Sequence, residues 1–161
     1  MRSKKKARQN AVHKEIYRTL RYNIELAGET NKTIAVTSCR PNDGKSTVAY
    51  QLASPFAEEG RKCILVDGDL RKSVLNQKMG LTDDINGLGC LLAGEKELDG
   101  VIYDIGQPKL KVLFSGKIKP NPTELLVNER FSALMSELKR EFDYVIVDTP
   151  PLGSVIDAAV I

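Results

Sequence analysis

Short apolar runs alternate with longer amphipathic stretches along most of the chain. Four runs are continuous and rich in β-branched residues, and they predict buried strands at residues 33–38, 62–67, 111–116 and 143–151. Apolar residues recur every three or four positions in three other stretches, which predicts helices from about Asn10 to Leu26, over 46–60 and over 122–142. A further element is expected to begin in the last eight residues.

The order of these elements predicts the fold class. Strands that alternate with helices form α/β proteins with a mainly parallel sheet, and continuous apolar strands fit a sheet that helices cover on both faces. Gly60 is expected to close the second helix. Pro55 lies inside that helix, where it removes one backbone hydrogen bond and is expected to kink or shorten it.

Composition narrows the class of protein without naming a function. The 161 residues suit one domain, and no apolar run approaches the roughly 18 residues of a membrane span. The basic N-terminus has no apolar stretch after it, so a signal peptide is not expected. The three cysteines are scattered, which predicts a protein of the reducing cytosol without disulfides. His13 is the single histidine, which argues against histidine-based catalysis.

The net charge of +3 is unevenly distributed. Residues 1–10 hold five basic and no acidic side chains, so the remaining 151 hold 19 basic against 21 acidic ones. Residues 1–9 are therefore interpreted as a basic arm and residues 10–161 as the folded domain. The arm is either a solvated segment or a segment that is weakly attracted to an anionic membrane surface. A nucleic-acid surface is not expected, because no basic and aromatic residues interleave.

The stretch "SCRPNDGKST" (38–47) resembles a phosphate-binding P-loop, although Cys39 stands where the motif begins with glycine. A predicted strand precedes it and a predicted helix follows, as a P-loop requires. The backbone at Gly44 would approach phosphate oxygens, Lys45 would neutralise charge and Ser46 would ligate Mg²⁺. An accidental G-K-S in a surface turn is the alternative. The residues assigned to nucleotide binding are Pro41, Asn42, Asp43, Gly44, Lys45, Ser46 and Thr47.

Acidic residues end two other predicted strands. In "ILVDGDLR" Asp67 ends an apolar strand with Asp69 and Arg71 beyond it, and in "VIVDTPP" Asp148 ends another. The carboxyl ends of parallel strands share one edge of a sheet, where ligands bind, and a hard cation there prefers oxygen ligands. Taken singly, Asp67 or Asp69 could instead be a helix N-cap. The metal ligands assigned are Ser46, Asp67 and Asp148.

The three motifs in this order resemble the bacterial tyrosine kinases of capsule and exopolysaccharide synthesis, with their Walker A, Walker A′ and Walker B motifs. "GLGCLLAGEKEL" (87–98), "SGKIKPNPTELL" (115–126) and "EIYRTLR" (15–21) are similar to further segments of that family. The resemblance covers roughly residues 10–161. It implies a P-loop NTPase fold and an ATP- and Mg²⁺-dependent, autophosphorylating protein-tyrosine kinase.

The resemblance also implies roles for individual residues. Lys45 holds the ATP phosphates, and Asp67 accepts the tyrosine proton or orders the metal's water. Asp69 supports the metal site or the base, and Arg71 positions phosphate or substrate. Positioning and charge neutralisation of this kind suffice for phosphoryl transfer.

Glu15, Arg18 and Arg21 lie three residues apart on the first predicted helix. From the residues alone they form a solvated face with weak pairs within the helix. In the resembling family this E-x-x-R-x-x-R element is associated with ring-like self-assembly, which implies an oligomer interface.

The chain departs from the family pattern at several positions. Asn42 replaces a glycine, a change that the P-loop should tolerate because asparagine adopts left-handed backbone comparatively well. Ser73, Phe114 and Lys119 replace prolines, and Pro55 is additional. None of these residues is expected to touch a proposed catalytic side chain. Family members continue past Ile161 into further strands and a tyrosine-rich tail. Residues 1–161 alone are therefore expected to bind ATP poorly and to lack the autophosphorylated tail.

The resemblance implies partners as well. These are a membrane-anchored regulator of polysaccharide chain length, further copies of the chain and a phosphotyrosine phosphatase in the same pathway. The expected location is the cytoplasm, at the inner face of the plasma membrane through the regulator. Two other functions stay open. One is a Min/Par-type partition ATPase, although the second lysine early in the P-loop of those proteins is absent here. The other is a non-catalytic nucleotide-binding partner.

Overall fold

A five-stranded sheet forms the centre of the computed structural model, which describes residues 2–28, 30, 32–82 and 84–152. The strand order is β1-β5-β2-β4-β3. Four strands are parallel: β1 (Thr33–Val36), β5 (Tyr144–Asp148), β2 (Cys63–Asp67) and β4 (Leu110–Leu113). The short edge strand β3 (Ile102–Asp104) runs antiparallel to β4. The mainly parallel α/β sheet is thus confirmed, while β3 was not predicted because three residues show no clear alternation.

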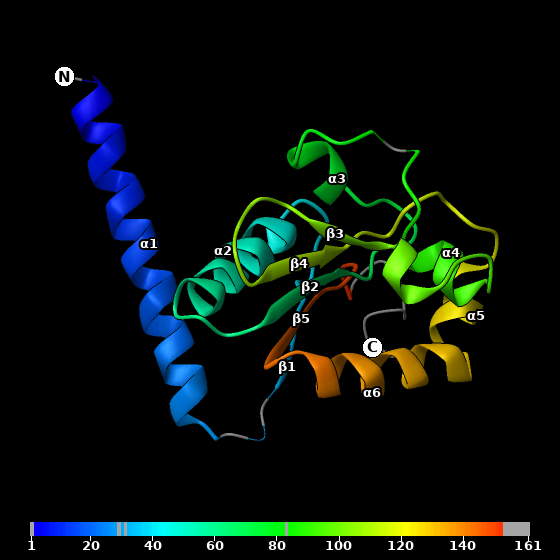
Figure 1. Cartoon of the computed structure of the whole chain (residues 1–161). Coiled ribbons are helices and arrows are strands. Elements are labelled where there is room, and N and C mark those ends of the chain that lie inside the picture. The colour runs from blue at the N-terminus through cyan, green and yellow to red at the C-terminus, as the bar shows by residue number, and fades with distance from the viewer. Residues whose placement is uncertain (1, 29, 31, 83, 153–161) are drawn as a thin grey trace.

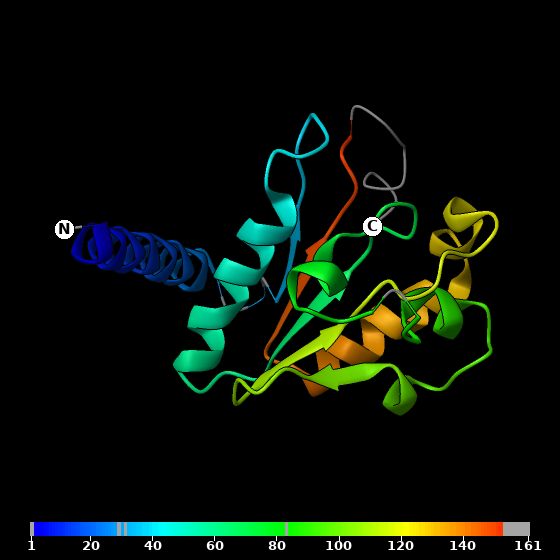
Figure 2. The same ribbon diagram turned by 90° about the horizontal axis from the view of Figure 1, so that it is seen from above.

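Helices cover both faces of the sheet (Figures 1 and 2). On one face lies α2 (Lys45–Glu58), with α1 (Arg2–Leu26) packed outside it. The other face carries α6 (Glu129–Glu141), with α4 (Leu88–Leu92) and α5 (Pro122–Leu126) beyond its end. The single turn α3 (Leu75–Lys78) follows β2, and a 3-10 turn, Leu98–Gly100, precedes β3.

Strand β2 shows how the sequence divides the core. Successive side chains of a strand point to opposite faces. Ile64 and Val66 accordingly pack on the α6 side, while Cys63 and Leu65 pack on the α2 side. All four are fully buried, which explains why this strand is a continuous apolar run.

The boundaries of all three predicted helices differ from the prediction. The first helix begins at Arg2, so the basic segment continues α1 instead of preceding it. The predicted helix 122–142 is two helices, because Asn128 adopts extended backbone and its side chain accepts a hydrogen bond from the Arg130 N–H over 3.1 Å. An asparagine N-cap starts a new helix at this point. Pro55 lies in the last turn of α2, which ends at Glu58, two residues before Gly60.

The carboxyl end of β4 is joined to the start of α4 by backbone contacts. The N–H of Leu88 donates to the carbonyl of Phe114 over 2.7 Å, and the N–H of Gly89 donates to the carbonyl of Ser115 over 3.0 Å. This approach requires glycine at 87, because a Cβ there would lie 2.3 Å from the Phe114 oxygen. Two segments that resemble kinase motifs, 87–98 and 115–126, therefore meet beside the end of β2. The element expected over 154–161 lies outside the described residues.

Candidate phosphate-binding and catalytic site

The P-loop connects β1 to the first turn of α2. Gly44 is the N-cap of α2 with φ +88°, and Asn42 has φ +64°, so both adopt left-handed backbone. The expectation that asparagine tolerates this conformation is confirmed. The loop is held by its own polar groups, since the Ser38 hydroxyl donates to the Arg40 carbonyl over 2.7 Å and the Arg40 N–H donates to Asp43 Oδ2 over 3.2 Å.

Asp67 and Asp148 end adjacent parallel strands and pair in register. Asp67 is fully buried and Asp148 is 2% exposed. The Gly68 N–H donates to the Asp148 carbonyl over 2.8 Å, which continues the pairing past the strand ends. The two carboxylates therefore lie side by side at the edge of the sheet where the P-loop helix begins, as the motif order predicted.

Donors from two segments hold the Asp67 carboxylate. Its Oδ2 accepts hydrogen bonds from the Ser73 hydroxyl and, over 3.3 Å, from the Ser115 N–H, and its Oδ1 accepts from the Asp69 N–H over 3.3 Å. Burial nevertheless raises the pKa of Asp67 to about 7, with the Asp148 and Asp69 charges adding to the rise and Ser73 and Ser115 opposing it. This carboxyl is thus able to exchange a proton near neutral pH.

The contact from Ser73 corrects one expectation. This residue stands where the resembling family has proline, and it was not expected to touch a catalytic side chain. A serine hydroxyl can donate to the neighbouring carboxylate, whereas a proline has no donor. The departure from the family pattern therefore acts directly on Asp67.

Asp148 has a different environment from Asp67. Burial raises its pKa, while the Ser46 hydroxyl and the Lys45 ammonium oppose the rise. Its Oδ1 is buried and has no hydrogen-bond partner among the described residues. An unsatisfied buried carboxylate oxygen is costly, so it favours a ligand that carries positive charge or a bound water.

Asp69 and Arg71 shape the turn after β2. Asp69 Oδ1 accepts from the backbone N–H groups of Arg71, over 3.2 Å, and Lys72, over 2.9 Å. The Arg71 guanidinium donates to the Thr123 hydroxyl over 2.6 Å, which links this turn to α5. Asp69 therefore has a local structural role in addition to any role at the site.

These residues fit a magnesium nucleotide. The first turn of α2 presents backbone N–H groups, Gly44 leaves open space where a side chain would stand, and Asp148 Oδ1 lacks a partner. In the described part of the chain no three His, Cys, Asp or Glu side chains form a metal cluster. A magnesium ion held by one or two carboxylates, water and phosphate oxygens needs no such cluster.

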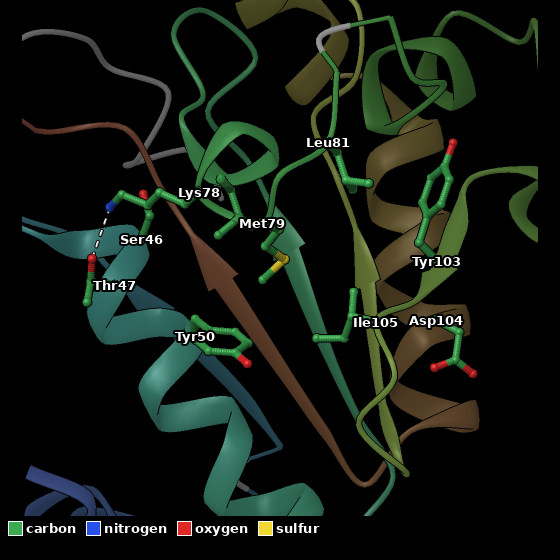
Figure 3. A pocket seen from close by; sticks show the side chains of 10 residues that line it. Ser46, Thr47, Tyr50, Lys78, Met79, Leu81, Tyr103, Asp104 and Ile105 are labelled. Atoms are coloured by element: carbon green, nitrogen blue, oxygen red, sulfur yellow. Dashed lines mark hydrogen bonds between the residues drawn. The ribbon is translucent and has the colours of Figure 1, made fainter. Parts of the chain in front are cut away.

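Cavities lined by residues of the P-loop adjoin this edge of the sheet. One, of about 420 Å³, is bounded by the P-loop, the turn after β2 and Pro150–Pro151. A larger one, of about 630 Å³, lies between α2, α3 and the β3 edge and is mostly apolar, with Tyr50, Met79, Tyr103 and Ile105 in its wall (Figure 3). Ser46 and Lys78 line both. The smaller cavity gathers five residues assigned to nucleotide binding, together with Asp69 and Arg71.

The predicted oligomer residues form ion pairs within their own chain. Arg18 forms an ion pair with Glu58 at 3.2 Å and a longer one, 3.9 Å, with Glu15. Arg21 pairs with Glu25 on the same helix and lies 3.8 Å from Glu59. These side chains are therefore engaged within one chain, and their role between chains stays a prediction.

Sequence reasoning missed four residues that border the site. Ser73, Ser115 and Thr123 contact Asp67 or Arg71, and Lys78 reaches the P-loop helix. The serine at 73 carried a signal, since it departs from the family pattern. The others depend on tertiary contacts between segments far apart in the sequence, which no local pattern reveals.

A phosphate-binding loop between β1 and α2, with carboxylates at the ends of the neighbouring strands, defines a P-loop NTPase. A family model described as an AAA domain matches residues 31–161. The septum site-determining protein MinD of Pyrococcus horikoshii, solved with Mg-ADP, shares this fold with a TM-score of 0.66 and 27% identity over 80% of this chain and 52% of that one.

The similarity to tyrosine kinases is stronger. The chain is 42% identical to tyrosine-protein kinase CpsD of Streptococcus agalactiae over 97% of its length and 68% of the relative's. It is 38% identical to tyrosine-protein kinase YwqD of Bacillus subtilis over 94% of this chain and 64% of that one. The kinase domain of Escherichia coli tyrosine kinase ETK superposes with a TM-score of 0.84 and 35% identity over 89% of this chain and 57% of that one.

The chain belongs to the bacterial tyrosine-protein kinase family, as its motifs predicted. It spans about two thirds of the length of these curated relatives. A further solved structure, the chimerical protein CapA2B2, matches with a TM-score of 0.85 and 37% identity over 91% of this chain and 65% of that one.

Proposed function

We propose that this protein is an ATP-dependent, autophosphorylating protein-tyrosine kinase that regulates capsular or exopolysaccharide synthesis and export. The observation that carries the proposal is the position of Asp67, buried beside Asp148 at the sheet edge that the P-loop helix also reaches. The kinase names of the relatives support the same reaction.

In this proposal each residue has a role in phosphoryl transfer. Residues 41–47 hold the phosphates of ATP, and Lys45 neutralises their charge. Ser46, Asp148 and Asp67 hold Mg²⁺, which supplies charge neutralisation on the phosphates when bound. Asp67 would accept the proton from the tyrosine hydroxyl at its carboxylate or would order the water of the metal, and its position beside Asp148 supports either role. Asp69 and Arg71 orient the turn that carries it.

We also propose partners for the kinase. Glu15, Arg18 and Arg21 would contribute to a ring-like homo-oligomer by exchanging their ion pairs within the chain for contacts with a neighbouring copy. A membrane-anchored regulator of polysaccharide chain length would activate the kinase and hold it at the inner face of the plasma membrane, and a phosphotyrosine phosphatase would oppose it. No described helix has both the length and the apolar composition of a membrane-crossing segment. Residues 10–161 would form the catalytic domain.

The test is phosphotyrosine formation on a tyrosine-rich acceptor peptide with Mg-ATP and an activating fragment of the regulator. Asp67→Asn removes the proposed base, and Asp99→Asn, which changes an exposed aspartate that is not among the assigned site residues, is the matched control. Signal in the parent and in the control but not in Asp67→Asn would support the proposal. ATP hydrolysis without phosphotyrosine would favour a partition-type ATPase, and neither activity would favour a non-catalytic binder.

A further inference from the structure

Lys78 extends from α3 to the first turn of the P-loop helix. Its Nζ donates a hydrogen bond to the Thr47 Oγ1 over 2.9 Å, the contact drawn as a dashed line in Figure 3. Thr47 directly follows the Lys45–Ser46 pair of the P-loop. The contact thus brings a basic side chain from a different segment to the end of α2 where phosphate is expected to bind.

The charges around this end of α2 favour an anion. Among the described residues of the 420 Å³ cavity wall, four are basic and Asp69 is the single acidic one; the basic residues are Lys45, Arg71, Lys72 and Lys78. A lysine ammonium has three donors, and Thr47 accepts from one of them. Within the described ranges no ion pair engages Lys78, so the other donors are available to a ligand.

We propose that Lys78 is a positioning residue for the nucleotide, whose ammonium contacts the α- or β-phosphate of ATP or ADP from outside the P-loop. This inference rests on the proposed function. P-loop backbone groups hold the α- and β-phosphates, and Thr47 lies at that part of the loop. Partition ATPases carry a second lysine within the P-loop, which this chain lacks. Here α3 of the same chain supplies the second positive charge.

The proposed Lys78 contact is defined by the phosphate that it reaches, and this distinguishes it from the contact of Lys45 within the P-loop. A group on the α- or β-phosphate interacts with ADP and ATP alike, whereas a group on the γ-phosphate favours ATP alone. Loss of one charge-assisted hydrogen bond weakens binding roughly tenfold. Lys78→Met is therefore expected to weaken Mg-ATP and Mg-ADP by the same factor.

The experiment measures the affinity of the whole chain for Mg-ATP and for Mg-ADP by calorimetry, with nucleotide up to the millimolar range. Lys78→Met removes the charge and keeps most of the side-chain volume, and Lys78→Arg restores a charge. Lys139→Met, an exposed lysine on α6, is the matched control. Affinity is measured at two salt concentrations, because loss of a phosphate contact reduces the salt dependence, which a structural effect would not change.

Equal weakening of ATP and ADP binding in Lys78→Met, a smaller salt dependence and recovery in Lys78→Arg would support the inference. Unchanged binding, or weakening of ATP binding alone, would overturn it and leave the proposed kinase intact. No binding of either nucleotide to the parent would overturn the inference, because Lys78 would then have no phosphate to position, and the proposed kinase would still be decided by the phosphotyrosine test. Binding that depends on Lys78 without phosphotyrosine formation would overturn the kinase and leave the Lys78 contact standing.

Discussion

The Ser73 hydroxyl donates a hydrogen bond to the fully buried carboxylate of Asp67. Ser73 also accepts from the Leu75 N–H over 3.1 Å, so one side chain joins the end of β2 to the start of α3. The same carboxylate oxygen accepts from the Ser115 N–H. The orientation of the proposed base is therefore set by two segments that lie far apart in the sequence.

Replacing Ser73 by alanine should destabilise the protein, because a buried carboxylate would lose its hydroxyl donor. The expected loss is about 1–3 kcal/mol in the free energy of unfolding near neutral pH. Chemical denaturation measures it. Ser136→Ala on α6 is the matched control, since the Ser136 hydroxyl donates only to the Ser132 carbonyl of its own helix and is exposed. Equal effects of the two substitutions would show that the contact to Asp67 is energetically unimportant.

The stability of the protein should depend on pH through Asp67. Its pKa is raised from 3.8 to about 7 on folding, so between these values the folded state keeps a proton that the unfolded state has lost. Stability therefore falls as pH rises through this window, and the full cost is present above it. Asp67→Asn removes this titration.

The measurement is the difference in unfolding free energy between Asp67→Asn and the parent, in the absence of nucleotide. Between about pH 5 and about pH 8 the parent should lose a few kcal/mol of unfolding free energy relative to the variant. The amide of Asp67→Asn has less acceptor capacity than the carboxylate at every pH, which shifts the stability difference by a constant amount. The test is therefore how the stability difference changes with pH, and its absolute value is not used. Asp99→Asn should give a flat difference. A flat difference for Asp67→Asn would contradict the buried, proton-exchanging carboxyl.

The sequence predicted the sheet and its functional edge because each depends on local patterns. Continuous apolar strands that end in Asp67 and Asp148 indicate where the carboxylates must lie. The break between α5 and α6 was missed because the helical periodicity continues across Asn128, whose capping geometry decides the boundary. The contacts of Ser115 and Lys78 were missed because they depend on how distant segments pack.

The ion pairs between α1 and α2 should hold the first helix on the domain. Glu58 is the common partner, with its carboxylate 2.9 Å from Lys14 Nζ and 3.2 Å from the Arg18 guanidinium. Lys14 and Arg18 lower the pKa of Glu58, so this stabilisation is present at neutral pH and is lost as pH falls through that lowered pKa.

Glu58→Gln should therefore increase amide hydrogen exchange along α1 near neutral pH. Because these side chains are partly exposed, the expected effect is below about 1 kcal/mol and should shrink at high salt. Glu141→Gln, at the exposed end of α6, is the control. Exchange along α1 that is unchanged in Glu58→Gln would show that the ion pairs of Glu58 do not hold the helix.

Gly87 is buried and should be sensitive to substitution. A Cβ at this position would lie 2.3 Å from the Phe114 carbonyl oxygen and 2.5 Å from the Gly116 nitrogen, so backbone would have to move. Gly87→Ala is expected to cost at least about 2 kcal/mol in unfolding free energy. Gly100→Ala is the matched control, because a Cβ there meets nothing within 4 Å.

The displaced backbone lies next to Ser115, whose N–H contacts Asp67 over 3.3 Å. Gly87→Ala should therefore also lower the phosphotransfer rate at saturating nucleotide, measured at a temperature where the variant remains folded. If Gly87→Ala and Gly100→Ala were equally stable, the close approach of α4 to the end of β4 would be wrong. If only stability changed, the α4 junction would support the fold without positioning Asp67.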